Sequence, residues 1–401
     1  MKTMKVALLA TAALAAVSVS ARADDTAAIK AQLEALTARI AQLEAAPAAP
    51  MGYSLLTISE GTATAVPGLE ETDPTYGDKA TVIGVMPTAD VPASASIEWS
   101  GYVRAAIVNY NYKNESTKDD STDVITRGQL KVVGKTDTAV GEVGVKVGLR
   151  AEGSTLDTKP TFVSNEYWGW WAMTPEITFG GGYSGSLGNI GYGYDGACNC
   201  YITDSAEVSL NPGDAHQLRL SWASGPMSAA VAVEDATGEK RFGSDADSIG
   251  VAGEVKYSGD VFSGEISGVY HDNGGSSFHT DSWQAGAGLG FSLGDMASLS
   301  IGGAMGQVSD GQDFWSASAL LSANLSDTIH AEISYGVKEY DEHVKPLPVI
   351  GPVGFDNTGI LAGIYYEPVS QLTLGLEGEY RKTDDVFRHA TTLDFVTVWR
   401  F

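Results

Sequence analysis

The chain has 401 residues and carries 50 acidic against 25 basic side chains, a formal net charge of −25 at pH 7. Because nucleic acids bind basic surfaces, so acidic a chain is not expected to bind them. Its 47 glycines, 17 tyrosines and 8 tryptophans are typical of strands and turns, and its two cysteines are too few for a disulfide scaffold.

The first 23 residues have the three parts of a secretory signal peptide. Lys2 and Lys5 precede the apolar run VALLATAALAAVSVSA, which leads into the small-residue sequence ARA at residues 21–23. We expect cleavage before Asp24 and export from the cytoplasm. No other stretch approaches the roughly 18 apolar residues of a membrane helix, so the exported chain is expected to be soluble or inserted as a β-barrel.

Residues 24–46 predict a short periplasmic coiled coil. Apolar residues recur there at alternating spacings of four and three, as a coiled-coil seam requires. The seam consists of Ile29, Leu33, Leu36, Ile40 and Leu43. So few heptads do not make a stable free-standing assembly, and a single amphipathic helix lying on a domain is the alternative. A linker rich in Pro, Gly and Thr follows over residues 47–93, and the sequence assigns it no role.

From residue 94 onward the apolar residues follow a period of two, as in strands with one apolar face. In the first segment this face carries Ile97, Trp99, Val103, Ala105 and Ile107, and the other face carries Glu98, Ser100, Tyr102 and Arg104. Such segments are about ten residues long, the length that a tilted strand needs to cross a bilayer. They cover residues 97–107, 123–135, 142–150, 163–173, 176–184, 215–224, 226–235, 246–257, 261–271, 281–292, 297–307, 312–324, 328–340, 357–367, 371–382 and 390–401.

The connections between these segments alternate in length. Tight turns are expected at 136–138, 174–175, 225–226, 258–260, 294–295, 326–327 and 368–370, and the intervening connections are mostly longer. Tight turns at one end and loops at the other are typical of an outer-membrane barrel with its turns in the periplasm. The predicted fold class is therefore all-β: a transmembrane antiparallel β-barrel of about 16 strands over residues 94–401.

The chain ends on Trp-Arg-Phe, with Trp399 and Phe401 on one face of the last segment. Together with the signal peptide, the opening strand SGYVR at residues 100–104 and the layout of turns and loops, this ending resembles the outer-membrane porins of alphaproteobacteria. The resemblance implies a homotrimer of sixteen-stranded barrels in outer-membrane lipid and lipopolysaccharide, each barrel a water-filled channel for small solutes. It also implies that the barrel-assembly machinery recognises Trp399 and Phe401. The coiled coil and the linker after it depart from a minimal porin and leave room for a role as a tether or a plug.

The longest connection, residues 185–214, contains the sequence GYGYDGACNC. The resemblance implies that this third loop folds into the lumen and narrows it. A nucleotide site is not favoured, because no strand–loop–helix context surrounds the glycines, and a zinc site needs four ligands whereas the loop has no His. Cys198 and Cys200 are a candidate disulfide, with free thiols as the alternative. The acids of the loop are Asp195, Asp204, Glu207 and Asp214.

The expected inward faces of the first three strands and of the sixth carry basic side chains. These are Arg104, Arg127, Lys131, Lys146, Arg150 and Arg219. If this basic wall faces the acids of the third loop, the separated charges create a field across the pore in which a dipolar solute aligns. The alternative is that these side chains only hydrate the lumen, as polar inward residues do in any porin.

Catalysis is not expected from this sequence. The six His residues have no Ser or Asp at a motif spacing, so we predict no enzyme activity, no cofactor and no metal site. The predicted function is passive diffusion of small hydrophilic solutes and ions across the outer membrane. The alternatives are a solute-specific channel, and a barrel that anchors the outer membrane to the cell wall, with peptidoglycan as the partner of the coiled coil.

Overall fold

The computed structural model describes residues 56–69, 74–77, 79–85, 95–113, 118–153, 161–193, 212–235, 249–272, 281–308, 311–341, 356–383 and 388–401. The predicted signal peptide and coiled coil, both cysteines, and the loop acids Asp195, Asp204 and Glu207 lie outside the described residues. Within the described ranges, no helix is long and apolar enough to cross a membrane.

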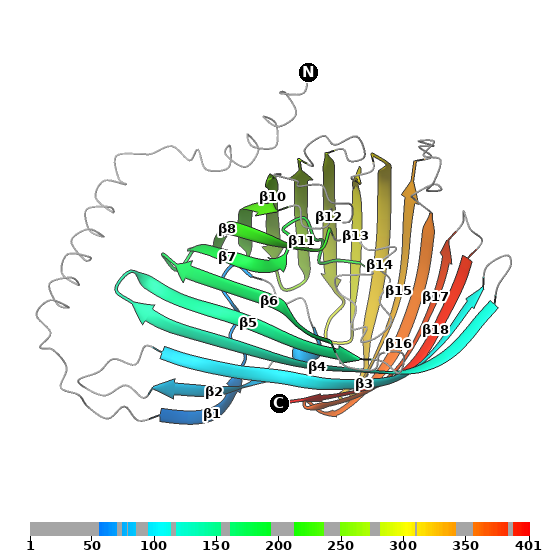
Figure 1. Ribbon diagram of the computed structural model, residues 1–401, viewed down its shortest axis with the longest axis horizontal. Helices are drawn as coiled ribbons and strands as arrows, with labels where there is room; N and C mark the ends of the chain where they lie inside the picture. The colour runs from blue at the N-terminus through cyan, green and yellow to red at the C-terminus, as the bar shows by residue number, and fades with distance from the viewer. Residues whose placement is uncertain are drawn as a thin grey trace, which may run out of the picture. The chain divides into compact units, whose positions relative to one another are not determined.

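Among the described residues, sixteen antiparallel strands form a closed barrel, which confirms the predicted fold class (Figure 1). Each strand pairs with the next in the chain, and β18 pairs back onto β3 from His389–Lys113 to Arg400–Tyr102. Because the ring is closed, the backbone N–H and C=O groups on both edges of every strand are paired, as they must be in lipid. The strands are β3 (Ala95–Lys113), β4 (Lys118–Thr138), β5 (Gly141–Gly153), β6 (Thr161–Ala172), β7 (Ile177–Gly185), β8 (Asp214–Ser224), β9 (Met227–Asp235), β10 (Ile249–Ser258), β11 (Phe262–His271), β12 (Ser282–Ser292), β13 (Ala297–Gln307), β14 (Asp313–Ser326), β15 (Ile329–Tyr340), β16 (Asn357–Val369), β17 (Leu372–Thr383) and β18 (Arg388–Arg400).

The strands have the two faces that the alternation predicts. In β3, Val103 and Ile107 point outward and are exposed, whereas Tyr102 and Arg104 point inward and are buried. A band of exposed apolar side chains therefore surrounds the barrel, as expected of a surface that contacts lipid rather than water. Exposed tryptophans lie near strand ends, where an interfacial girdle would place them. They are Trp99, Trp171, Trp222, Trp283, Trp315 and Trp399.

The connections alternate between tight turns and longer loops, but several bounds differ from the prediction; the last tight turn, for example, lies between Val369 and Leu372 rather than at 368–370. The first tight turn lies between Thr138 and Gly141 rather than at 136–138, because β4 stays paired with β5 through Thr138. Strands β3 and β4 have 19 and 21 residues instead of about ten. Their last residues, 109–113 and 118–123, pair as far as Lys113–Lys118 but are mostly polar or tyrosine, so they lack the alternation that marks a lipid-facing strand.

Two further strands and a 3₁₀ turn lie in the predicted linker. Strand β1 spans Leu56–Thr62, the turn η1 spans Pro74–Tyr76, and β2 spans Lys79–Val85. Strand β2 pairs with β1 and with the beginning of β3, from Thr81–Trp99 to Gly84–Ser96. This pairing uses the edge of β3 beyond the part that pairs with β18, at the end of the barrel that carries the tight turns.

Candidate functional site

The inner face of the barrel is the candidate site, and the beginning of the third loop lies against it. The backbone N–H of Gly191 donates to Glu265 Oε1 at 2.6 Å, and the N–H of Gly193 donates to Ser300 Oγ at 2.7 Å. Ile190 is fully buried and packs in a cluster with Ala304 and Phe314. The partners belong to strands β11, β13 and β14, so the described part of this loop lies against the inner wall.

Glycines of β12 make room for this loop. Gly286 and Gly288 occupy inward positions, and Ile190 and Tyr192 pack directly on their backbone. A Cβ atom at Gly288 would collide with the ring and the Cβ of Tyr192, so a larger residue here would push the loop away from the wall. The sequence GAGLG at residues 286–290 therefore sets how closely the loop follows the wall.

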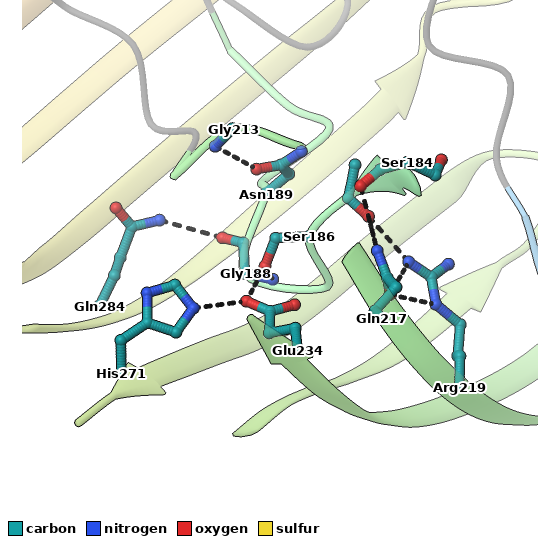
Figure 2. Close-up of polar contacts among 11 residues, drawn as sticks. Ser184, Ser186, Gly188, Asn189, Gly213, Gln217, Arg219, Glu234, His271 and Gln284 are labelled. Carbon is teal, nitrogen blue, oxygen red and sulfur yellow. Dashed lines mark hydrogen bonds and ion pairs between the residues drawn. The ribbon is translucent and has the colours of Figure 1, made fainter. Parts of the chain in front are cut away.

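The start of the third loop is fixed by a polar network around Glu234 of β9 (Figure 2). Ser186 Oγ donates to Glu234 Oε1 at 2.8 Å, and His271 Nε2 lies 2.8 Å from the same oxygen. Nearby, Gln284 Nε2 donates to the carbonyl of Gly188 at 3.0 Å. Because Glu234 is only 2% exposed, these bonds are made away from bulk water, where the loss of a partner is costly.

Arg219 of β8, one of the predicted basic residues, joins two segments that are far apart in the sequence. Its Nη2 donates to the carbonyl of Gly185 at 2.8 Å, at the root of the third loop. Its Nη1 donates to the carbonyl of Gly68 at 3.0 Å, in the chain that precedes the barrel. Gln217 accepts from Arg219 Nε at 3.0 Å and donates to the carbonyls of Ser184 and Gly185 (Figure 2).

Two other predicted bases form ion pairs within the wall itself. Lys146 Nζ of β5 lies 2.5 Å from Glu166 Oε2 of β6, and the Lys146 side chain is 3% exposed. Arg127 Nη2 of β4 lies 2.8 Å from Glu152 Oε1 of β5. Paired charges of opposite sign partly cancel at a distance, so these two bases contribute less to a field across the pore than isolated bases would.

The last three predicted bases lie on the same wall. Arg150 Nε donates to Gln129 Oε1 at 3.1 Å, Lys131 Nζ lies 4.1 Å from the centre of the Tyr76 ring, and Arg104 is buried. Of the loop acids, the structure describes Asp214, the exposed first residue of β8. The other three lie outside the described residues, so the opposition of basic wall and acidic loop stays a prediction.

The predicted site residues of the wall are all basic, and of the buried acids of the inner wall only Glu98 was placed on the inward face by the sequence pattern. Glu377 and Asp394 are buried and stand opposite each other in the register of β17 and β18. Both follow the rule that identified Arg104, because each sits between outward apolar residues in an alternating strand. The wall therefore carries charges of both signs. Its buried glutamates and aspartates are Glu98, Asp123, Glu234, Glu265, Glu332, Glu377, Glu379 and Asp394.

The last residue completes the seam of the barrel. The N–H of Phe401 donates to the carbonyl of Gly101 at 3.0 Å, and the N–H of Gly101 donates back at 3.3 Å. The Phe401 ring covers Gly101, where a Cβ atom would come within 2.7 Å of it. Trp399 and Phe401 are both exposed on the outer face, at the level of the tight turns.

Comparisons with known proteins identify the fold. No family model and no curated protein matches the sequence. The outer-membrane channel DcaP of Acinetobacter baumannii superposes with a TM-score of 0.60 at 14% identity, covering 77% of this chain and 98% of that one. The anion-selective porin from Comamonas acidovorans gives 0.56 at 15% identity, covering 77% and 100%. The loop L8 deletion mutant of OmpT from Vibrio cholerae gives 0.53 at 11% identity, with the same coverage. What the chain shares with these outer-membrane proteins is the closed barrel.

Proposed function

We propose that the chain is an outer-membrane porin, a channel for the passive diffusion of small hydrophilic solutes and ions. The observation that carries this proposal is a closed ring of strands with an apolar exterior and a charged interior. Such a ring satisfies the hydrogen bonds of every backbone group in lipid. Its inward charged side chains indicate a lumen that contains water, as in porins. The similarity of the fold to outer-membrane channels supports the same conclusion.

Swelling of liposomes that contain the purified protein tests this function. We expect swelling in uncharged sugars to become slower as the sugar becomes larger, because the third loop limits the width of the lumen. Protein-free liposomes give the baseline. Swelling with one class of solute alone favours the solute-specific channel, and no swelling with any solute contradicts the proposal.

Assembly is the finer part of the proposal. We place the barrel in the outer membrane as a homotrimer among lipid and lipopolysaccharide, with Trp399 and Phe401 recognised by the barrel-assembly machinery. The exposed aromatic pair at the end of the last strand supports that recognition. The role of the N-terminal coiled coil as a link to peptidoglycan remains the alternative function.

Ion selectivity tests the basic wall. The double substitution of Arg104 and Arg127 by Ser is expected to move the reversal potential in a salt gradient toward cation preference by about 10 mV, because two positive charges leave the lumen. The matched control replaces Lys113 and Lys118 by Ser; both are exposed and face each other at the tip of the β3–β4 hairpin. Equal reversal potentials for the two double variants would mean that the basic wall only hydrates the lumen.

A further inference from the structure

We propose that the described residues of the segment 63–77, which precedes the barrel in the sequence, form a plug that is anchored inside the lumen and limits conduction. The proposal rests on the proposed channel function and deepens it. Within this segment the structure describes residues 63–69 and 74–77. Their contacts are with inward side chains of β3, β4, β6, β8 and β18, on the side of the lumen that the described part of the third loop leaves uncovered.

The first anchor of the plug is apolar. Val66 is 7% exposed and belongs to a buried cluster with Val133, Trp168 and Trp170, whose side chains point inward from β4 and β6. Burial of this apolar side chain away from water favours the docked position of the segment. In a wide water-filled lumen Trp168 and Trp170 would contact water. Here each is only 3% exposed, because the plug covers it.

Polar bonds fix the plug on either side of Val66. The N–H of Thr64 donates to Glu98 Oε2 at 2.8 Å, the Thr64 hydroxyl donates to the other carboxylate oxygen, and Lys135 Nζ donates to that hydroxyl at 3.1 Å. Gly68 has a φ of +72° and packs on Ser221, so a side chain there would meet both strain and a collision. These contacts fix the path of the backbone as well as its side chains.

The second anchor lies at the far end of the plug. The Tyr76 ring meets the Tyr102 ring edge-on at 5.3 Å, and Lys131 Nζ lies above the Tyr76 ring. Arg400 Nε donates to the carbonyl of Thr75 at 2.6 Å. Aromatic contacts and cation–π contacts of this kind favour the docked position of the plug. The plug is thus held at both ends by the wall that carries most of the predicted basic residues.

Arg219 connects the plug to the third loop. The same guanidinium donates to Gly68 in the plug and to Gly185 at the root of the loop. The Cζ atom of this guanidinium also lies 5.1 Å from the centre of the ring of Trp168, a residue of the apolar anchor. The two inward segments therefore share one support, and displacement of the plug removes one partner of the guanidinium that also holds the root of the loop.

Single-channel currents test the plug. In the double variant Val66→Asn/Tyr76→Ala both anchors of the plug are weakened while every residue of the barrel wall is kept. We expect its conductance step to be at least about twofold larger than that of the wild type, since conduction follows the width of the pore. The control Ala65→Asn changes the neighbouring exposed residue and is expected to keep the wild-type step.

Thiol labelling checks the position of the plug independently. In a Cys198→Ser/Cys200→Ser background, Ala65→Cys is expected to react with a bulky maleimide much faster than Val66→Cys. Equal labelling rates, or a wild-type step in the double variant, would overturn the plug while leaving the channel intact. No current from any form, the wild type included, would instead refute the proposed channel function and the plug with it.

Discussion

Replacement of Ile266 by Arg is expected to destabilise the barrel by about 2 to 4 kcal/mol, the cost of a basic side chain near the middle of the bilayer. Ile266 lies near the middle of β11, is 70% exposed, and stands between Val255 and Ala287 of the neighbouring strands on the outer face. Urea unfolding of the protein in lipid vesicles, followed by tryptophan fluorescence, measures the effect.

The control for this substitution is Ile266→Leu, which keeps an apolar side chain of the same volume and is expected to cost less than 1.5 kcal/mol. The difference between the two variants isolates the charge from the change of shape. Arg and Leu variants of equal stability would mean that this face of β11 meets water rather than lipid.

Replacement of Lys146 by Met is expected to cost about 3 kcal/mol of stability, because it leaves the carboxylate of Glu166 buried without its ion pair. The two side chains are 3% and 15% exposed, so the pair is largely shielded from solvent. Glu166 would keep only the hydroxyl of Ser184, at 3.0 Å, among the partners that the described contacts give it. The same unfolding experiment in vesicles measures the loss.

The double variant Lys146→Met/Glu166→Gln completes a mutant cycle for this pair. It removes both charges and should regain most of the lost stability, since the penalty comes from the unpaired carboxylate rather than from the missing attraction. If the single variant Lys146→Met lost less than about 1 kcal/mol of stability, the Lys146–Glu166 pair would be behaving as a surface salt bridge in a well-hydrated lumen.

The barrel could be predicted from the sequence because each strand has its own signal. A lipid-facing strand needs an apolar residue at every second position. This pattern can be read from residues that are close together in the sequence. The alternation fails in β6, where EYWGWW carries rings on both faces. The structure places Trp168 and Trp170 inward and Tyr167 and Trp171 outward. Val66 buries Trp168 and Trp170, and no local pattern in the sequence predicts this contact.

The contents of the lumen were predictable only in part. The basic residues of the inner wall follow from the strand period, and so do the acids that the prediction omitted, such as Glu377 and Asp394. The segment 63–77 has no period at all, and its bond to Arg219 joins residues that are 151 positions apart. Contacts of such long range depend on the closed ring being in place, so the sequence left room for a tether or a plug in residues 47–93 without distinguishing between them.

The proposed function requires that the interior of this barrel conducts ions across a membrane. Recording purified full-length protein in a planar lipid bilayer tests it most directly, because each inserted channel adds a discrete step of current. We expect uniform steps that recur at every insertion and scale with the salt concentration. A protein that inserts into the bilayer and yet adds no current at any salt concentration would contradict it.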